Sequence, residues 1–324
     1  MIRAGIIGGA GYTAGELIRI LVNHPEVRIN FAHSQSNAGK PVCQVHEGLI
    51  GDTDLHFCDE FDLRDIDVLF MCGAHGKSAE FWQNTKRPEG LKVIDLAQDF
   101  RDESCGFVYG LPEWKLKSEP GILSDAVSVA NPGCFATAIQ IALLPLAHAG
   151  LLTDEVQITA ITGSTGAGAK PGPTTHFSWR NSNVSSYKVF EHQHLIEIKR
   201  NLSIIQGTPV REINFIPVRG DFSRGIFASL HTRCEWSEER ILSLFKDYFD
   251  SAAFTFVSDA PVDLKQAVNT NKCVLHIEKH KDNLVITSVL DNLLKGASGQ
   301  AVQNMNIIFG LDQKSGLRLK ASAF

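Results

Sequence analysis

The chain has 324 residues, of which 44% are hydrophobic and 21% charged, with a formal net charge of −5. This balance is typical of a soluble globular protein, long enough for two domains. It offers neither a basic patch for a nucleic acid partner nor an apolar run of the ~18 residues that span a membrane. The seven cysteines show no zinc-ligand spacing, which favours reduced thiols in a cytoplasmic protein.

The N-terminus predicts a strand over residues 2–7 rather than a signal peptide. A glycine loop follows over residues 8–15, and then an amphipathic helix over residues 16–22. Strand, glycine loop and helix in this order form a cradle for phosphate. We expect Gly8 to permit the tight turn and Gly11 the close approach of a pyrophosphate. The loop alone is weak evidence, because such turns also occur without a ligand.

The second strand, residues 27–32, completes a β-α-β unit and leads into a polar loop. An NAD site usually has an acidic residue here that binds the ribose hydroxyls. This loop offers Ser34, Ser36 and Lys40 instead. We therefore predict a phosphorylated ribose, and hence NADP as cofactor. A polar loop without a ligand is the alternative.

Continuous apolar runs at 67–72 and 92–96 predict buried strands of a parallel sheet, separated by a helix through residues 81–82. The last strand of this half is predicted at 127–130. The carboxyl ends of such strands share one edge of the sheet, where ligands bind. Gly73 and Arg101 follow two of these strands, and Arg101 is a candidate for binding the phosphate or carboxylate of a substrate.

Cys134 lies between a proline-glycine turn and a strongly apolar run that predicts a buried helix over residues 138–144. Its place in the first helical turn favours the thiolate, because the N–H groups there lack partners and the helix dipole attracts negative charge. The same N–H groups can stabilise an oxyanion. We predict Cys134 as a nucleophile; a small buried cysteine is the alternative.

The second half continues with a strand at 156–161 and a loop of small residues at 162–172 that includes Lys170. Such a backbone can approach an anion closely, or it is merely flexible. Residues 176–181 predict a surface or subunit contact. His192 and His194 would share a face on a strand. Acid-base chemistry beside the thiol is favoured over a metal pair, because no third ligand lies nearby.

The rest of the chain predicts several strands, with a hairpin-like turn at 279–283 and a helix that begins at Ser237. A final helix follows Lys295. This pattern favours an α+β domain with a mostly antiparallel sheet. We expect an NADP-binding domain over residues 1–133, with the helix in 296–324 packing back on it, and a catalytic domain over residues 134–295.

The chain resembles the N-acetyl-gamma-glutamyl-phosphate reductases, NADP-dependent semialdehyde dehydrogenases of arginine biosynthesis, nearly from end to end. Each shared motif is modest, but six in the same order are specific. They are Gly8-Gly9-Ala10-Gly11-Tyr12-Thr13-Ala14-Gly15-Glu16-Leu17, Val108-Tyr109-Gly110-Leu111-Pro112-Glu113, Asn131-Pro132-Gly133-Cys134, Gly163-Ser164-Thr165-Gly166-Ala167-Gly168, His192-Gln193-His194 and Lys295-Gly296-Ala297-Ser298-Gly299-Gln300-Ala301-Val302-Gln303-Asn304.

The resemblance implies an α/β fold, with a Rossmann dinucleotide-binding domain and an α+β dehydrogenase-type catalytic domain, in a homodimer or homotetramer. It implies Cys134 as nucleophile and His192 as acid-base partner, with His194 nearby. We expect His194, Arg101 and Lys170 to bind an acyl-phosphate substrate. No metal is implied. The residues expected at NADP are Gly8, Gly11, Tyr12, Thr13, Ser34, Ser36, Gly73, Gly163, Ser164, Gly166, Asn292 and Gly296.

The chain departs from the family pattern at Ala14, at Phe135-Ala136 and at Leu195-Ile196-Glu197. The departures near Cys134 and His194 leave an N-succinyl substrate as an alternative to N-acetyl. An aspartate-semialdehyde dehydrogenase is the neighbouring enzyme alternative. A cysteine hydrolase or acyltransferase, and an NADP-sensing regulator, are the alternatives from other classes.

Overall fold

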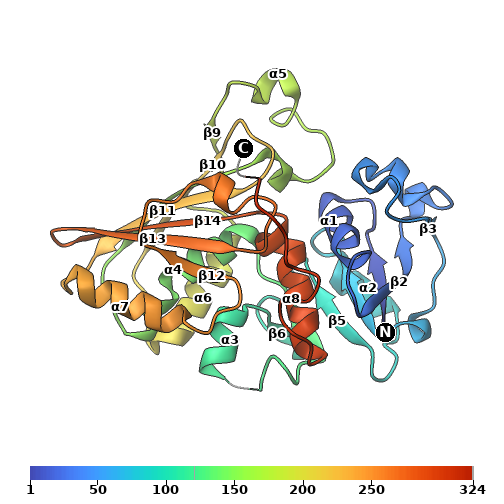
Figure 1. Cartoon of the computed structure of the whole chain (residues 1–324), viewed down its shortest axis with the longest axis horizontal. Helices are drawn as coiled ribbons and strands as arrows, with labels where there is room; N and C mark the ends of the chain where they lie inside the picture. The colour runs from blue at the N-terminus through green and yellow to red at the C-terminus, as the bar shows by residue number, and fades with distance from the viewer. Residues whose placement is uncertain (120, 323–324) are drawn as a thin grey trace. The chain divides into compact units, whose positions relative to one another are not determined.

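The computed structural model describes residues 1–119 and 121–322, which form two compact units (Figure 1). The first unit comprises Met1–Pro132 and Ala297–Arg318. The second comprises Gly133–Gly296 and the described residues after Arg318. The chain therefore passes from the first unit to the second between Pro132 and Gly133, immediately before Cys134.

A seven-stranded parallel sheet forms the core of the first unit, as the continuous apolar runs predicted. The two-residue strands β3 and β6 at its edges were not predicted, because they are too short to show a periodicity. In spatial order the strands are β3 (Phe57–Cys58), β2 (Val27–His33), β1 (Ile2–Ile7), β4 (Val68–Met71), β5 (Lys92–Asp95), β7 (Ser128–Ala130) and β6 (Val108–Tyr109).

In the described part of the first unit the α-helices are α1 (Tyr12–Leu21), α2 (Lys77–Asn84), α3 (Pro112–Ser118) and α8 (Gly299–Ile308). The prediction that the first helix begins at residue 16 was wrong. Helix α1 begins at Tyr12, within the predicted glycine loop, and Gly11 is its N-cap. Helix α3 has a proline in its first turn, a favoured place that the sequence analysis missed. Helix α8 contacts α1 and β5.

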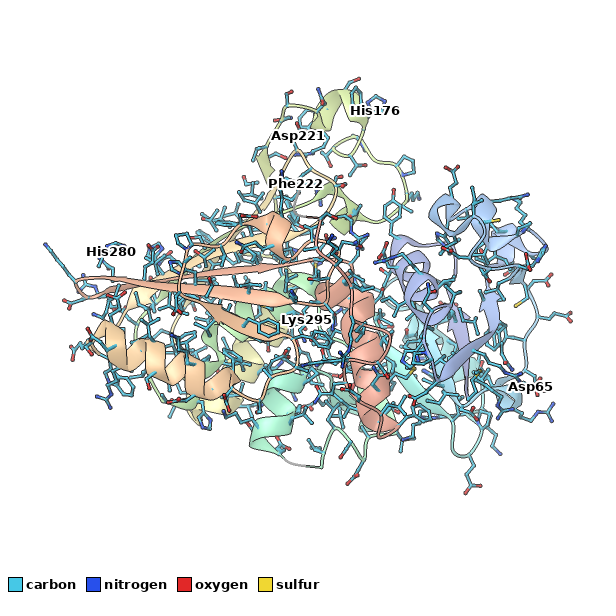
Figure 2. The ribbon with its side chains drawn as sticks, in the orientation of Figure 1. Asp65, His176, Asp221, Phe222, His280 and Lys295 are labelled. Carbon is cyan, nitrogen blue, oxygen red and sulfur yellow. The ribbon has the colours of Figure 1, made fainter. Side chains whose placement is uncertain are left out.

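A mixed seven-stranded sheet forms the core of the second unit, and only the pairs β12–β13 and β8–β10 are parallel. The predicted mostly antiparallel sheet is confirmed. The predicted hairpin is also present, and Figure 2 shows His280 near its tip. In spatial order the strands are β12 (Thr255–Ser258), β13 (Cys273–His280), β14 (Asn283–Leu290), β11 (Ile226–Arg233), β8 (Val156–Thr162), β10 (Ile213–Arg219) and β9 (Ser185–Ser186).

The helices of the second unit are α4 (Cys134–His148), α5 (Phe177–Arg180), α6 (His194–Gln206) and α7 (Glu238–Phe249). Helix α4 is almost wholly buried and packs against α6 and strands β11 and β14. Helix α7 begins as predicted, since the Ser237 side chain accepts a hydrogen bond from the N–H of Arg240. No helix in the described part of the chain combines the length and apolar character that crossing a membrane requires.

Candidate active site

Cys134 is the first residue of α4, so the prediction of a cysteine in the first helical turn is confirmed. Gly133 is the N-cap and has no side chain, and the first turn contains no acidic residue. The first-turn N–H groups therefore face no competing anion from within this turn, and the helix dipole favours a thiolate there. The Cys134 side chain is partly exposed, as attack on a substrate requires.

Gly296 lies directly against the nucleophile. A Cβ atom at Gly296 would be 2.8 Å from the Cβ of Cys134 and 3.2 Å from the carbonyl oxygen of Asp291. Since these distances leave no room for a side chain, glycine is required at this position. Gly296 belongs to a π-helical turn over Leu294–Ser298, an irregularity often found at functional sites.

His192 and His194 do not lie on a strand, so the shared strand face considered from the sequence is wrong. His192 occupies the turn before α6, and His194 is the first residue of that helix. The N–H of His194 donates to Nδ1 of His192 at 3.2 Å. A neutral His192 ring therefore carries its proton on Nε2 and can donate a hydrogen bond from that atom.

The electrostatic surroundings keep His192 neutral. Its side chain is buried, and this burial, together with the nearby positive charges of Lys188 and Arg219, lowers its pKa to about 4. At neutral pH the ring is thus a hydrogen-bond donor rather than an imidazolium acid. This refines the acid-base role expected from the sequence.

An aromatic cluster links His192 to the nucleophile's helix. The His192 ring centroid lies 5.4 Å from that of Phe135, 5.5 Å from Phe215 and 5.8 Å from Tyr187, all in edge-on contacts. Phe135 is the residue after Cys134. Burial raises the pKa of Tyr187 to about 12, and the neighbouring Cys134 adds to this rise. Tyr187 and His192 thus gather at the first turn of α4.

Arg219 places a guanidinium group in the same cluster. Its Cζ lies over the Tyr187 ring, 4.6 Å from the centroid. Arg180, which is buried, donates to the Arg219 carbonyl oxygen at 2.7 Å and to the Ser185 hydroxyl at 3.0 Å. Arg180 therefore anchors the segment that carries Tyr187 to the end of β10.

Glu197 is a site residue that the sequence analysis missed. It lies in the first turn of α6 and is buried, and its Oε2 accepts a hydrogen bond from the Gly133 N–H at 3.3 Å. This bond fixes the residue that precedes Cys134. The helical spacing of Leu195, Ile198 and Leu202 could have predicted α6, and with it the direction of Glu197.

The small-residue loop of the second unit packs beside Asn292. The Asn292 amide donates to the Thr165 hydroxyl at 3.1 Å and accepts from the Gly225 N–H at 2.7 Å. Gly163 must be glycine, because a Cβ there would lie 2.4 Å from the Ser223 carbonyl oxygen. The structure therefore brings together four of the predicted cofactor residues, namely Gly163, Ser164, Gly166 and Asn292.

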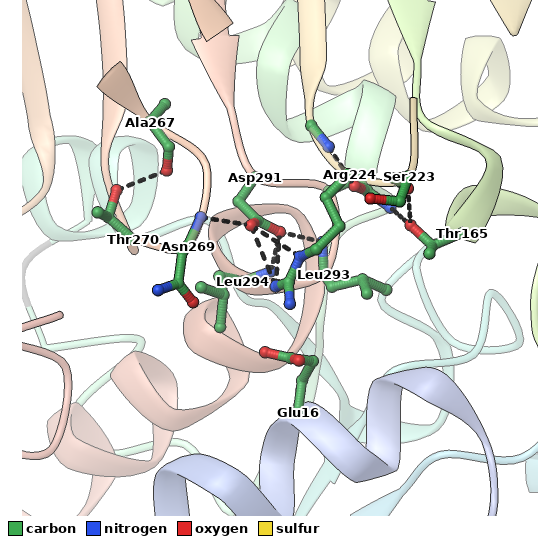
Figure 3. A network of polar contacts seen from close by, with 12 residues as sticks. Glu16, Thr165, Ser223, Arg224, Ala267, Asn269, Thr270, Asp291, Leu293 and Leu294 are labelled. Atoms are coloured by element: carbon green, nitrogen blue, oxygen red, sulfur yellow. Dashed lines mark hydrogen bonds and ion pairs between the residues drawn. The ribbon is translucent and has the colours of Figure 1, made fainter. Parts of the chain in front are cut away.

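Arg224 forms an ion pair with Asp291. Its guanidinium donates to both oxygens of Asp291 at 3.1 Å, and Asp291 is fully buried (Figure 3). Asp291 also accepts from the N–H groups of Asn269 and Leu293. This network shapes the turn before Gly296, which is the role that the structure gives Arg224.

The predicted cofactor residues of the first unit lie at the carboxyl ends of three adjacent strands, β2, β1 and β4. Gly8 has a φ of +82°, and a Cβ there would be 2.8 Å from the Cys72 carbonyl oxygen. A Cβ on Gly11 would meet only the Gly8 carbonyl oxygen, at 3.8 Å. Helix α1 has no acidic residue in its first turn and no side-chain cap. These features suit a pyrophosphate at the N-terminus of α1. The residues at this edge are Gly8, Gly11, Tyr12, Thr13, Ser34, Ser36 and Gly73.

The polar loop after β2 is held by its own side chains. The Asn37 amide donates to the hydroxyls of Ser34 and Ser36, and Lys40 Nζ donates to Asn37 Oδ1 at 3.1 Å. Two hydroxyls and an ammonium group are therefore close together, with no carboxylate in this set. This grouping is compatible with a phosphorylated ribose.

Arg101 and Lys170, both predicted to bind substrate, differ in their surroundings. Arg101 is buried, and its Nε donates to the Asn131 carbonyl oxygen at 3.0 Å and its Nη2 to that of Leu96 at 3.2 Å. Lys170 is exposed in the loop after Ser164–Ala167. Their roles at a substrate remain predictions.

Two family models match the chain. One, described as "Semialdehyde dehydrogenase, NAD binding domain", matches residues 3–119, and the other, "Semialdehyde dehydrogenase, dimerisation domain", matches residues 134–292. The chain is 56% identical, over the full length of both sequences, to the N-acetyl-gamma-glutamyl-phosphate reductases of Phocaeicola vulgatus and of Bacteroides fragilis.

Solved structures agree on the fold. Aspartate semialdehyde dehydrogenase II of Vibrio cholerae, complexed with ASA, has a TM-score of 0.74 at 17% identity and covers 96% of this chain and 98% of its own. The enzyme of Candida albicans with NADP has a TM-score of 0.71 at 15% identity, with coverages of 95% and 99%. At this identity the likeness concerns the fold alone, and it does not favour the aspartate alternative.

Proposed function

Because this chain belongs to the family of N-acetyl-gamma-glutamyl-phosphate reductases, we propose that it reduces N-acetyl-gamma-glutamyl phosphate to the semialdehyde through a thioester on Cys134. One observation carries the covalent route: Cys134 begins α4, beside a cluster that holds a neutral histidine. A nucleophile, the N–H groups of a helix N-terminus and a hydrogen-bond donor are the groups that acyl transfer needs.

In the first step the Cys134 thiolate attacks the γ-carbonyl carbon. A carbon–sulfur bond forms, the carbon–oxygen bond to phosphate breaks, and a thioester remains on Cys134. The proton that the overall reaction consumes ends on the released phosphate. The N–H groups of the first turn of α4 stabilise the oxyanion of the tetrahedral intermediate.

In the second step the thioester is reduced and the aldehyde is released. The nicotinamide, when bound, supplies the hydride. His192 donates a hydrogen bond from Nε2 to the developing alkoxide. Collapse of the thiohemiacetal then breaks the carbon–sulfur bond and regenerates the thiolate. Because His192 is neutral, it needs neither to lose nor to regain a proton in this step.

The residues at the carboxyl edge of the parallel sheet support a nicotinamide dinucleotide, and we propose NADP. The bare backbone at Gly8 and Gly11 would hold the pyrophosphate. Ser34, Ser36 and Lys40 would hold the 2′-phosphate. In the second unit, the loop at Gly163–Gly166, together with Asn292 and Gly296, would face the cofactor.

The substrate's anionic groups call for cationic partners. Arg219 lies in the cluster beside Tyr187 and His192, which makes it the best-placed candidate for a carboxylate or phosphate. Arg101, Lys170 and His194 remain the other proposed contacts. The dimerisation domain over residues 134–292 supports a homo-oligomer, and we propose a homodimer or homotetramer in the cytoplasm.

An assay of the reverse reaction tests the function. N-acetylglutamate semialdehyde with phosphate should reduce NADP, and aspartate semialdehyde should not. Comparing the rate of NADP reduction with N-succinylglutamate semialdehyde shows which acyl group the enzyme prefers. With NAD in place of NADP we expect kcat/KM to fall at least about tenfold, because the ion pairs with the 2′-phosphate are lost. Equal rates with NAD would contradict the NADP assignment.

A further inference from the structure

Asn131 lies three residues before Cys134, and each of its polar atoms makes a hydrogen bond. Its N–H donates to the Asp95 carbonyl oxygen at 2.7 Å, and its own carbonyl oxygen accepts from Arg101 Nε at 3.0 Å. Its side-chain Nδ2 donates to the Ala297 carbonyl oxygen at 3.1 Å, and its Oδ1 accepts from Asn304 Nδ2 at 3.1 Å. Asn131 is 1% exposed.

Asn304, in the middle of α8, is the side chain that completes this arrangement. It is fully buried, and its Nδ2 also donates to the Gly110 carbonyl oxygen at 2.9 Å. Both of its amide hydrogens therefore have acceptors. A flipped amide would place Oδ1 against two acceptors, so the network determines the orientation.

Two features indicate that the Asn304 amide serves a specific purpose. A Cβ on Gly110 would lie 2.5 Å from Asn304 Nδ2, so only bare backbone lets the amide approach. The amide also keeps this orientation although its buried Oδ1 has no hydrogen-bond partner within the described residues. Leaving a buried acceptor unsatisfied is costly, and such groups call for an explanation.

We propose that Asn304 is a positioning residue for the nucleophile, which it orients through Asn131. Pro132, whose φ is restricted by its ring, follows Asn131 directly. Gly133 is anchored in turn, because its N–H donates to Glu197. The short segment before Cys134 is thus anchored at Asn131 and at Gly133. This inference rests on the proposed function, in which Cys134 forms the thioester.

The test compares Asn304→Asp with a matched control on the same helix, Asn306→Asp. Asn306 is also fully buried, and its Nδ2 also donates to two backbone carbonyl oxygens, those of Gln313 and Ser315. In each variant a carboxylate oxygen replaces the amide NH2, so two donated hydrogen bonds are lost and an acceptor faces two acceptors. Only Asn304 contacts the segment before Cys134.

We expect Asn304→Asp to lower kcat roughly 10- to 100-fold with little change in KM, because small displacements of a reacting group have effects of this size. The rate at which iodoacetamide alkylates Cys134, read by peptide mass spectrometry at several pH values, should fall several-fold near neutral pH. In Asn306→Asp, kcat and the rate of Cys134 alkylation should both stay within about threefold of the wild-type values. We expect this even where the two variants lose similar thermal stability.

Two outcomes would overturn the proposal: wild-type kcat and alkylation in Asn304→Asp, or equal losses of both in Asn306→Asp. If Asn304→Asp does not fold, Asn304→Ala and Asn306→Ala give the same comparison without a new charge. Alkylation does not depend on the thioester. If the proposed reaction is wrong, the Cys134→Ser enzyme will be active. If only the positioning role is wrong, Asn304→Asp will leave alkylation of Cys134 unchanged, so the two results can be told apart.

Discussion

Replacing Cys134 with serine should lower the rate of aldehyde formation by roughly 10⁴-fold or more. A serine hydroxyl at the start of α4 is not ionised near neutral pH, whereas a thiol in this position is biased toward the thiolate. The substitution changes one atom, so the fold and cofactor binding should be kept. Steady-state assays with NADPH, together with quenching of nicotinamide fluorescence on binding, measure the two effects separately.

The matched control is Cys105→Ser, because Cys105 is exposed and lies in a turn of the first unit. This variant should retain wild-type activity. Substantial turnover by Cys134→Ser, or an equal loss in Cys105→Ser, would contradict covalent catalysis at Cys134.

Replacing His192 with asparagine should lower kcat roughly 10²- to 10⁴-fold while the affinity for NADPH is kept. The asparagine Oδ1 can still accept the His194 N–H, which His192 Nδ1 accepts in the native chain. The donor at Nε2 is lost, and with it the proposed hydrogen bond to the alkoxide. His280→Asn, at the exposed hairpin tip, is the control. A near-normal rate in His192→Asn would transfer the role to another group.

The lowered pKa of His192 also predicts how stability depends on pH. The folded-state pKa of about 4 lies below the ordinary value of 6.5, so the unfolded chain binds the extra proton first. The neutral His192 therefore contributes on the order of 3 kcal/mol to the free energy of unfolding. This contribution is complete above pH 6.5 and is lost as the pH falls toward 4. Urea unfolding at several pH values should show a shallower decline in His192→Asn. An identical decline would contradict a buried neutral His192.

The sequence predicted those parts of the fold whose signal is local. Residues 67–72 and 92–96 were predicted as buried strands because each range has a continuous apolar core, and β4 and β5 lie within these ranges. Cys134 was placed in a first helical turn because a proline-glycine pair precedes a long apolar run. The start of α7 followed from Ser237 as its cap. None of these features depends on residues distant in the chain.

The parts of the site that depend on distant partners were not predicted. Glu197 reaches Gly133 across 64 positions, and Arg224 pairs with Asp291 across 67. Tyr187 enters the cluster because its segment pairs with β10, where its N–H donates to the Pro217 carbonyl oxygen and the Arg219 guanidinium lies over its ring. A shared strand face was considered for the two histidines because their spacing of two residues fits one, whereas a helix begins at His194.

Trapping the acyl-enzyme tests the central claim, a thioester on Cys134, most directly. The enzyme is mixed with N-acetylglutamate semialdehyde and NADP in buffer without phosphate, and the products are quenched in acid for peptide mass spectrometry. The aldehyde adds to the thiolate, hydride loss gives NADPH, and the thioester then lacks its phosphate acceptor. We predict a burst of about one NADPH per active site and the acyl mass on the peptide that contains Cys134. A burst that leaves Cys134 unmodified would contradict the account.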